Sequence, residues 1–106
     1  MREFDPAELK DYLESCEATP FLLDVRQQWE YDVCRIEGSE LIPMGQIQAR
    51  VEELNPEQET VVICHHGVRS RAVARFLDQV GFTNVINLKG GVDQWAKKVD
   101  TSMSTY

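Results

Sequence analysis

The stretch that most constrains the fold is an apolar run that ends at a cysteine and is followed by a short turn and an amphipathic helix. Residues 61–63 are Val, Val and Ile, and a continuous β-branched run of this kind is typical of a strand buried on both faces. Beyond the turn, apolar side chains recur at helical spacing and predict a helix over about 70–79, ended by Gly81. A buried strand that leads into a helix is the unit from which parallel sheets are built.

Further strands and helices alternate along the rest of the chain. Apolar runs predict three more strands, at 21–25, 41–42 and 84–87. Asp5, followed by Pro6 and Glu8, marks the start of a helix that runs to about residue 15. Helical spacing or a glycine pair predicts the remaining helices, at 26–31, at 47–54 and from 90 onward. This alternation predicts an α/β fold with a mostly parallel central sheet and helices on both faces.

The length and composition predict one folded domain. The chain has 106 residues, close to the commonest domain size of about 100–150 residues. Hydrophobic residues make up 42% and charged residues 27%, which is the composition of a globular protein rather than a disordered one. We expect the domain to span residues 1–98 and a C-terminal tail to span 99–106, with a loose polar segment at 101–106.

Charge and cysteine content limit the binding partners and the cellular locations that the chain is expected to have. The formal charge of −7 argues against broad binding to nucleic acid or to an anionic membrane surface, because both require a basic footprint. Residues 1–5 lack the apolar core of a signal peptide, and no apolar run approaches the roughly 20 residues of a membrane-spanning helix. The three cysteines are irregularly spaced and odd in number, which does not suit a disulfide framework. We expect a cytoplasmic protein, and the oligomeric state stays open.

Cys64 is the candidate reactive residue, because it lies between the clearest strand and a helix. Ligands of open α/β sheets gather at the carboxyl ends of the strands. The turn at 65–68 is short enough for successive backbone N–H groups to converge on the sulfur or on a bound anion. Gly67 can adopt the positive φ that such a turn often needs. Positive charge is concentrated in the same region, on Arg69, Arg71 and Arg75.

A cysteine attacks as the thiolate, and an ordinary thiol is mostly protonated at neutral pH. Shifting its ionisation by about two pH units takes roughly 2.7 kcal/mol. A helix N-terminus supplies about 0.3–1 kcal/mol, or about 2 kcal/mol in a partly buried site, so the loop N–H groups and Arg69 would have to supply the rest. The interpretation also requires that the Cys64 side chain is not turned inward, away from solvent.

The loop residues also have structural interpretations. Cys64 could be a small buried residue that ends an apolar strand, although the strand, cysteine, turn, arginine and helix together favour a functional role. His65 and His66 either tune the charge of the loop or are exposed turn residues without catalytic duty. We expect no metal, because three adjacent residues cannot easily surround a tetrahedral ion and spaced cysteine pairs are missing. No phosphate-loop or dinucleotide glycine pattern indicates a cofactor.

Three charged residues close to the strand at 21–25 are expected to form a structural brace rather than catalytic machinery. Asp24 lies near the end of the strand. Arg26 and Glu30 stand four residues apart in a predicted helix, where such a pair is worth a few tenths of a kcal/mol.

The sequence resembles the rhodanese family over nearly its whole length. The resemblance is carried by Leu23-Asp24-Val25-Arg26, Glu30-Tyr31, Ile36-Glu37-Gly38-Ser39, Ile42-Pro43, Val61-Val62-Ile63-Cys64 with Gly67, Arg69 and Ser70, and then Gly81-Phe82, Val85, Leu88, Gly90-Gly91 and Trp95. It implies a rhodanese-like domain with sulfurtransferase activity. Cys64 would take sulfane sulfur from a small anionic donor such as thiosulfate, hold it as a persulfide, and pass it to a thiol or another thiophilic acceptor.

The resemblance also implies roles for the rest of the loop. The donor and persulfide would be held by the N–H groups of His65, His66, Gly67, Val68, Arg69 and Ser70. Arg69 would offer bidentate contacts to an oxyanion and, with Ser70, help to place the donor. Cys-based phosphatases, the nearest rivals, have five residues between Cys and Arg, whereas this chain has four, which favours a smaller sulfur ligand. Two alternatives stay open: an oxyanion enzyme, either phosphatase or arsenate reductase, and a non-catalytic sulfur-carrier or binding module.

The sequence departs from the usual family pattern before the strand at 41–42. Cys34-Arg35 stands where the family usually shows Gly-His, and the usual small Ala and Asn nearby become Ser39 and Leu41. These changes could alter a rim contact or the access of a donor. Cys34 is either a second thiol that resolves the persulfide or a partly buried spacer.

Overall fold

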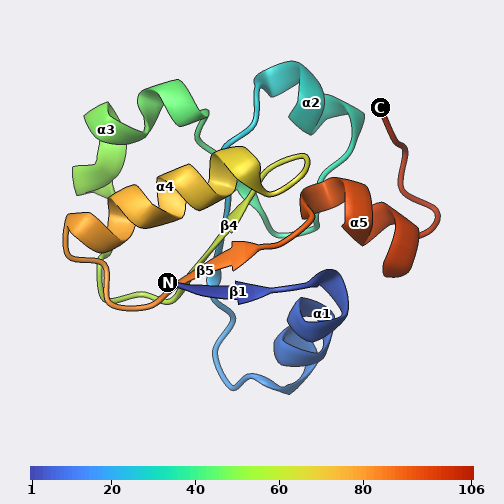
Figure 1. The fold of residues 1–106 in the computed structure, drawn as a ribbon, viewed down its shortest axis with the longest axis horizontal. Helices are drawn as coiled ribbons and strands as arrows, with labels where there is room; N and C mark the ends of the chain where they lie inside the picture. Colours follow the sequence, from blue (N-terminus) through green and yellow to red (C-terminus); the bar gives the residue numbers. More distant parts are fainter.

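The computed structural model describes all 106 residues and contains one five-stranded parallel sheet (Figure 1). The strands lie in the order β1-β5-β4-β2-β3, and every neighbouring pair is parallel. The α/β fold predicted from the alternating pattern is therefore confirmed. The strands are β1 (Arg2–Phe4), β2 (Phe21–Asp24), β3 (Glu40–Leu41), β4 (Thr60–Ile63) and β5 (Val85–Leu88).

Helices cover both faces of the sheet (Figure 1). One core cluster joins the sheet to α3 and α4 and includes Ile47, Val73 and Leu77. A second cluster, on the other face, joins the sheet to α1 and α5 through Leu9 and Trp95. None of the helices is both long and apolar enough to cross a membrane. The helices are α1 (Pro6–Ser15), α2 (Gln28–Val33), α3 (Ile47–Arg50), α4 (Val68–Gln79) and α5 (Gly91–Lys98), with 3-10 turns at Met44–Gln46 and Val51–Glu53.

The strand register brings the ends of three strands together at one edge of the sheet. In the pairing of β2 with β4, Asp24 lies opposite Ile63, and in the pairing of β4 with β5, Val62 lies opposite Asn87. All four residues of β4 are buried, as its apolar composition predicts. Cys64 therefore follows the central strand and lies between residues that follow β2 and β5.

Two local predictions need correction. The strand β1 was not predicted, because its residues are mostly exposed and lack an apolar pattern. Its pairing with β5 makes it a strand, and only the folded sheet supplies that partner. The predicted helix over 47–54 is broken into α3 and a 3-10 turn, while α4 begins at Val68, two residues earlier than predicted. The early start places Arg69 and Ser70 in the first turn of α4.

The predicted pair between Arg26 and Glu30 is wrong. Arg26 precedes α2, so the two side chains do not share a helix face. Arg26 instead pairs with Asp24, at 2.9 Å from Nε to Oδ1 and 2.7 Å from Nη2 to Oδ2, and both side chains are fully buried. Its Nη2 also donates to the main-chain oxygen of Cys34 at 2.7 Å. The pair thus joins the end of β2 to the segment after α2, which is a structural brace.

The sequence predicted a loose polar segment at 101–106, but this segment is packed against the domain. Met103 and Tyr106 are partly buried and pack against the cluster on the α1 and α5 side. The Tyr106 hydroxyl lies 3.0 Å from Nη1 of Arg26. The polar composition of 101–106 conceals these two contacts, because they are made with residues far away in the sequence.

We predict that Asp24→Ala lowers the free energy of unfolding by about 3–5 kcal/mol, because it leaves the Arg26 guanidinium buried without its counter-ion. Urea unfolding measures the loss. Glu14→Ala, which removes the exposed pair with Lys10, is the matched control and should cost less than about 1 kcal/mol. Equal losses in the two variants would contradict the role of Asp24 and Arg26 as a brace.

Candidate active site

The sulfur of Cys64 lies inside the loop that connects β4 to α4. The backbone N–H of Gly67 donates to Sγ at 3.1 Å, and that of Ser70 donates at 3.3 Å. Gly67 has a φ of 93°, in the left-handed region, which turns the chain around the sulfur. Two of the predicted N–H groups therefore converge on the sulfur, and both come from the start of α4, where the helix dipole also favours negative charge.

The loop is held against the turn between β5 and α5. The N–H of Val92 donates to the Cys64 oxygen at 2.9 Å, and the N–H of Asp93 donates to the His65 oxygen at 3.0 Å. A Cβ atom at Gly67 would lie 3.0 Å from the Gly90 nitrogen, so a side chain at this position would require the neighbouring backbone to shift. The start of α5 thus fixes the backbone that surrounds the sulfur.

The expectation that the Cys64 side chain reaches solvent is wrong. The residue is only 1% exposed and belongs to the core cluster on the α3 and α4 side. The sulfur faces the N–H groups of its own loop rather than the outside. Cys64 therefore meets the requirement for N–H donors at its sulfur, but it does not meet the requirement for access to solvent in this conformation.

A buried polar chain leads from the sulfur to the edge of the sheet. Sγ of Cys64 lies 3.3 Å from Oγ of Ser70, and the Ser70 hydroxyl makes a short hydrogen bond to Oδ1 of Asn87. Nδ2 of Asn87 donates to Oε2 of Glu3 at 2.8 Å and to the Gly67 oxygen at 3.2 Å. Ser70 and Asn87 are both fully buried. Asn87 was not among the residues predicted for the site; its one signal in the sequence is that it is a polar residue in a largely apolar predicted strand.

Arg69 forms a bidentate ion pair with Glu30, at 2.8 Å for both contacts. The Arg69 guanidinium lowers the pKa of the Glu30 carboxyl to about 2, and burial opposes this shift. Glu30 in turn raises the pKa of Arg69. The two nitrogen atoms that were predicted to bind a donor oxyanion are therefore already occupied, and α2 is tied to the first turn of α4.

Two histidine rings of the loop form an aromatic stack with the ring of Tyr106. The ring of Tyr106 stacks on His65 at 4.1 Å between centroids, and His65 stacks on His66 at 4.0 Å. Trp29 contacts Tyr106 edge to face. Burial and the neighbouring His66 lower the pKa of His65, which favours a neutral ring at pH 7. Tyr106 also donates to Oε1 of Glu30 at 3.0 Å, so the tail contacts the same carboxylate as Arg69.

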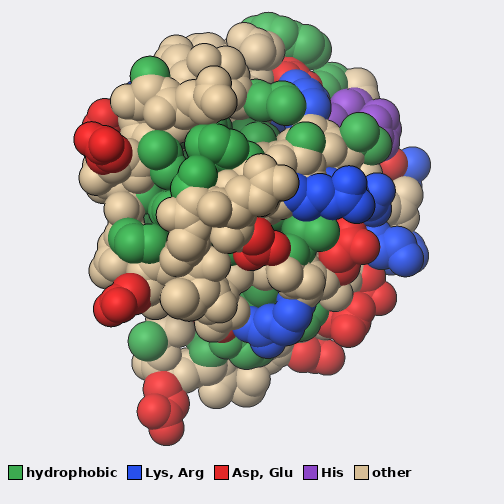
Figure 2. All heavy atoms as spheres, turned by 60° about the vertical axis from the view of Figure 1, so that its left-hand side comes forward, with side chains coloured by type: hydrophobic (Ala, Val, Ile, Leu, Met, Phe, Trp, Pro, Cys, Tyr) green, Lys and Arg blue, Asp and Glu red, His purple; other side chains and the backbone are tan.

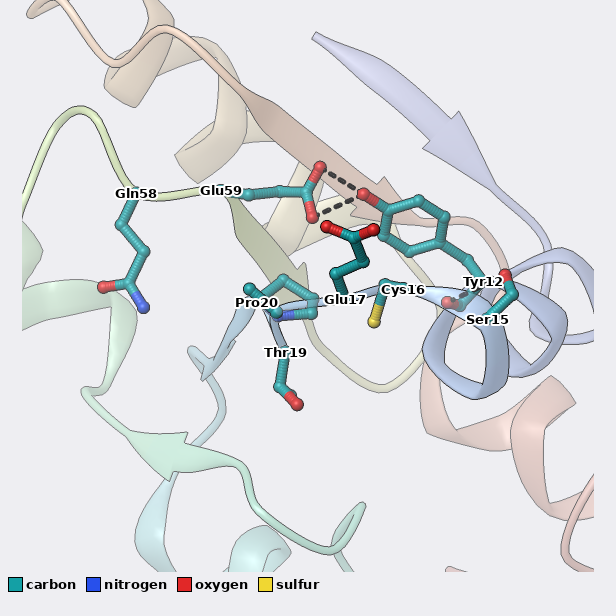
Figure 3. Close-up of a pocket in the computed structure, with 9 residues that line it drawn as sticks. Tyr12, Ser15, Cys16, Glu17, Thr19, Pro20, Gln58 and Glu59 are labelled. Carbon is teal, nitrogen blue, oxygen red and sulfur yellow. Dashed lines mark hydrogen bonds between the residues drawn. The ribbon is translucent and has the colours of Figure 1, made fainter.

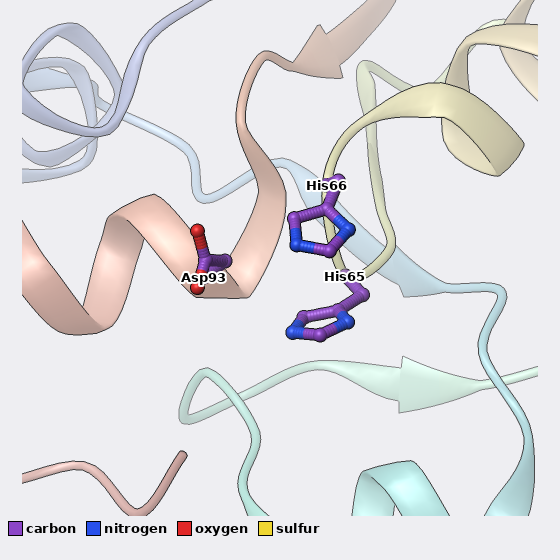
Figure 4. Close-up of side chains that lie close together, drawn as sticks. All are labelled: His65, His66 and Asp93. Carbon is purple, nitrogen blue, oxygen red and sulfur yellow. The ribbon is translucent and has the colours of Figure 1, made fainter. Parts of the chain in front are cut away.

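His65, His66 and Asp93 lie close together, with potential ligand atoms within 4.8 Å of one another (Figure 4). The two imidazole rings are stacked rather than directed at a common point. The Asp93 carboxylate accepts from Lys97 and from Gln94. We therefore assign no metal to these three residues.

Two hollows lie away from the sulfur of Cys64. The first, of about 600 Å³, is lined by residues from the end of α1 and from the segments that precede β2 and β4, including Cys16, Pro20 and Glu59 (Figure 3). Because it lies at the amino ends of these strands, it is at the opposite edge of the sheet from Cys64. The second is an apolar groove lined by residues of α3 and α4 such as Ile47 and Phe76, and Figure 2 shows a face on which hydrophobic side chains gather, with histidine at its edge.

Cys34 is partly buried and forms no disulfide. Its Sγ lies 3.8 Å from Nη1 of Arg26, and its main-chain oxygen also binds this guanidinium. Both contacts belong to the brace, which agrees with the interpretation of Cys34 as a partly buried spacer.

The fold and the site together define a class of α/β proteins. In this class a cysteine follows the central strand of a parallel sheet, and its sulfur accepts hydrogen bonds from backbone N–H groups. Comparison with known proteins identifies the family within this class. A family model described as "Rhodanese-like domain" matches residues 5–98, and the chain belongs to this family. The solved structure of a rhodanese-like domain protein from Staphylococcus aureus matches with a TM-score of 0.82 and 29% identity, over 90% of this chain and 91% of that one.

Two proteins of Bacillus subtilis (strain 168) are similar in sequence. YrkF, provisionally named a sulfur carrier protein, is 40% identical over 79 residues, which cover 74% of this chain and 43% of YrkF. YtwF, provisionally named a sulfurtransferase, is 37% identical over 95 residues, which cover 90% of each chain. The chain therefore spans less than half of YrkF and nearly all of YtwF.

We predict that Gly67→Ala destabilises the protein more than Gly38→Ala. Both glycines have positive φ, at 93° and 86°, so each alanine carries about 1–2 kcal/mol of backbone strain. Only the Gly67 variant also places a Cβ against neighbouring backbone, because nothing lies within 4 Å at Gly38. Urea unfolding of the two variants measures the difference, and equal losses would show that the loop has room for a side chain.

We predict that Glu30→Gln makes the free energy of unfolding less dependent on pH at acidic pH. The folded protein holds the pKa of Glu30 near 2, below the ordinary 4.5, so this stabilisation is complete above about pH 4.5 and is lost as the pH falls toward 2. Wild-type protein should therefore lose more stability over this window than the variant. Denaturation at a series of pH values tests this, with the exposed Glu52→Gln as control; parallel profiles for Glu30→Gln and wild type would exclude the effect.

Proposed function

We propose that this protein is a sulfurtransferase that carries sulfane sulfur on Cys64. The observation that carries the proposal is the pair of N–H groups, from Gly67 and Ser70, directed at the Cys64 sulfur. These donors would stabilise negative charge on the sulfur and on a persulfide formed there. Membership of the rhodanese-like family, with relatives named as a sulfur carrier and a sulfurtransferase, supports the same chemistry.

The proposed reaction has two balanced steps. The Cys64 thiolate attacks the outer sulfur of a donor such as thiosulfate; a sulfur–sulfur bond forms to Cys64, the sulfur–sulfur bond of thiosulfate breaks, and sulfite leaves. A thiophilic acceptor then attacks the outer sulfur of the persulfide, and the Cys64 thiolate is released. With cyanide as acceptor the product is thiocyanate. The partners are thus a small sulfur-containing anion and a thiol or another thiophile.

Arg69 makes the alternative of a phosphatase or arsenate reductase less suitable. An oxyanion with several equatorial oxygens needs a free guanidinium, and both contacting nitrogen atoms of Arg69 are paired with Glu30. The loop of four residues between Cys64 and Arg69 is also short for a tetrahedral anion. In the proposed attack only the outer sulfur of thiosulfate would enter the loop, where the N–H groups that already face Cys64 would hold it, and the SO₃ group would stay outside and leave as sulfite.

A carrier that holds sulfur without rapid turnover is the second candidate, and the burial of Cys64 favours it. Because Cys64 is only 1% exposed, the residues that cover it would have to move before each transfer. A carrier would load sulfur once and release it only to a docked acceptor, whereas an enzyme would produce thiocyanate continuously from thiosulfate and cyanide.

We also propose a cytoplasmic location, because three unpaired cysteines are consistent with a reducing compartment.

We predict that thiosulfate adds the mass of one sulfur atom to the Cys64-containing peptide, and that Cys64→Ser abolishes both this addition and thiocyanate formation. Cys16→Ser and Cys34→Ser are the matched controls and should retain both. Intact-mass and peptide-mass spectrometry, with an assay of thiocyanate, provide the measurements. Sulfur addition without thiocyanate would favour the carrier, and turnover of an aryl phosphate or arsenate without sulfur addition would overturn the proposal.

A further inference from the structure

We propose that Asn87 is a positioning residue that fixes the direction of the Ser70 hydroxyl proton and thereby holds the idle Cys64 as a protonated thiol. This inference rests on the proposed function and adds that Asn87 regulates the nucleophile Cys64. It depends on four hydrogen bonds, three buried and one partly buried, that connect Cys64, Ser70, Asn87 and the groups behind Asn87.

The contacts of Asn87 determine which way its amide points. Nδ2 contacts the carboxylate of Glu3 at 2.8 Å and the main-chain oxygen of Gly67 at 3.2 Å. An ionised carboxylate and a carbonyl can only accept hydrogen bonds, so both must face the NH₂ group of Asn87. The remaining atom, Oδ1, is therefore the one that faces Ser70, and it can only accept.

The Ser70 hydroxyl has a single proton, and Oδ1 of Asn87 takes it. Toward Cys64, at 3.3 Å, Oγ of Ser70 consequently presents lone pairs. Lone pairs accept a hydrogen bond from a thiol but repel a thiolate. The N–H groups of Gly67 and Ser70 donate to the sulfur in either state, so the Ser70 hydroxyl is the contact that distinguishes the two.

Ionisation of Cys64 therefore requires a rotation of the Ser70 hydroxyl. The thiol proton leaves to solvent or to a base, and the hydroxyl turns from Asn87 to the sulfur. Oδ1 of Asn87 then loses its donor in a fully buried position, which carries a free-energy cost. Asn87 thus favours the thiol in the idle protein, and a thiol is oxidised much less readily than a thiolate.

Other charged groups lie around the loop, but they do not set the direction of the Ser70 hydroxyl. Arg69 and Glu30 form an ion pair on the α2 side, and Glu3 pairs with Arg71 behind Asn87. His65, His66 and Asp93 lie beside the loop. Substitution of Ser70 or Asn87 by a neutral residue leaves all of these charges in place.

The test uses protein in which Cys64 is the only cysteine, through Cys16→Ser and Cys34→Ser, with ¹³C at the cysteine Cβ and at the asparagine Cγ. The NMR shift of Cys64 Cβ against pH gives the midpoint of its ionisation without requiring a reagent to enter the loop. We expect the Cγ shift of Asn87 to change with the same midpoint, because its oxygen loses the Ser70 proton in that step. In Ser70→Ala this coupled change should disappear.

The variant Asn87→Leu should lower the Cys64 midpoint by about one pH unit, a tenfold larger ionisation constant, because the hydroxyl can then donate to the sulfur at no cost. In the Ser70→Ala background the same substitution should have no effect. Glu3→Gln, which keeps an oxygen for Asn87 to bind, is the matched control and should leave the midpoint near that of the wild type.

An Asn87 Cγ shift that stays constant through the Cys64 transition overturns the proposal, as does an Asn87→Leu effect that persists without the Ser70 hydroxyl. The wild-type titration needs no substitution of Asn87 and decides the matter even if Asn87→Leu does not fold. Failure of the sulfurtransferase proposal is separate: it would appear as absence of sulfur on Cys64 after incubation with thiosulfate, while the coupled titration would remain.

Discussion

The site depends on the hydrogen bonds that the main-chain N–H groups of Gly67 and Ser70 donate to the sulfur of Cys64. These groups point at the sulfur because the chain turns back at a left-handed glycine and enters α4 at once. Backbone donors that are already oriented need no rearrangement when charge develops, and they are therefore effective stabilisers of a thiolate or persulfide. The position of the sulfur beyond the central strand follows from the sheet order.

Separate parts of the chain hold this loop in place. The start of α5 donates to the main chain of Cys64 and His65, and the ion pair between Arg69 and Glu30 ties the other side to α2. Tyr106 contacts both Glu30 and the ring of His65. The hydrogen bond between Ser70 and Asn87 connects the loop to β5. The result is a loop whose backbone is held from several sides and whose cysteine is covered.

Much of the fold was predictable because the relevant signals are local. The capping box around Asp5 set the start of α1, and the β-branched run at 61–63 predicted the central strand and the cysteine after it. The partner of Arg26 was mispredicted because spacing along a helix was applied to a residue that lies before the helix. The edge strand β1 and the packed tail were missed because their partners are distant in sequence.

The sequence by itself determined the α/β class, the reactive candidate Cys64 and the glycine that its loop requires, since periodicity and backbone preference act between near neighbours. Only the tertiary structure decided that the sulfur is buried, that Glu30 occupies Arg69, and that Asn87 lies behind Ser70. These contacts join residues 17–39 positions apart, brought together by strand pairing and helix packing. Partner choice among distant polar groups is set by three-dimensional proximity, and a linear pattern carries no record of it.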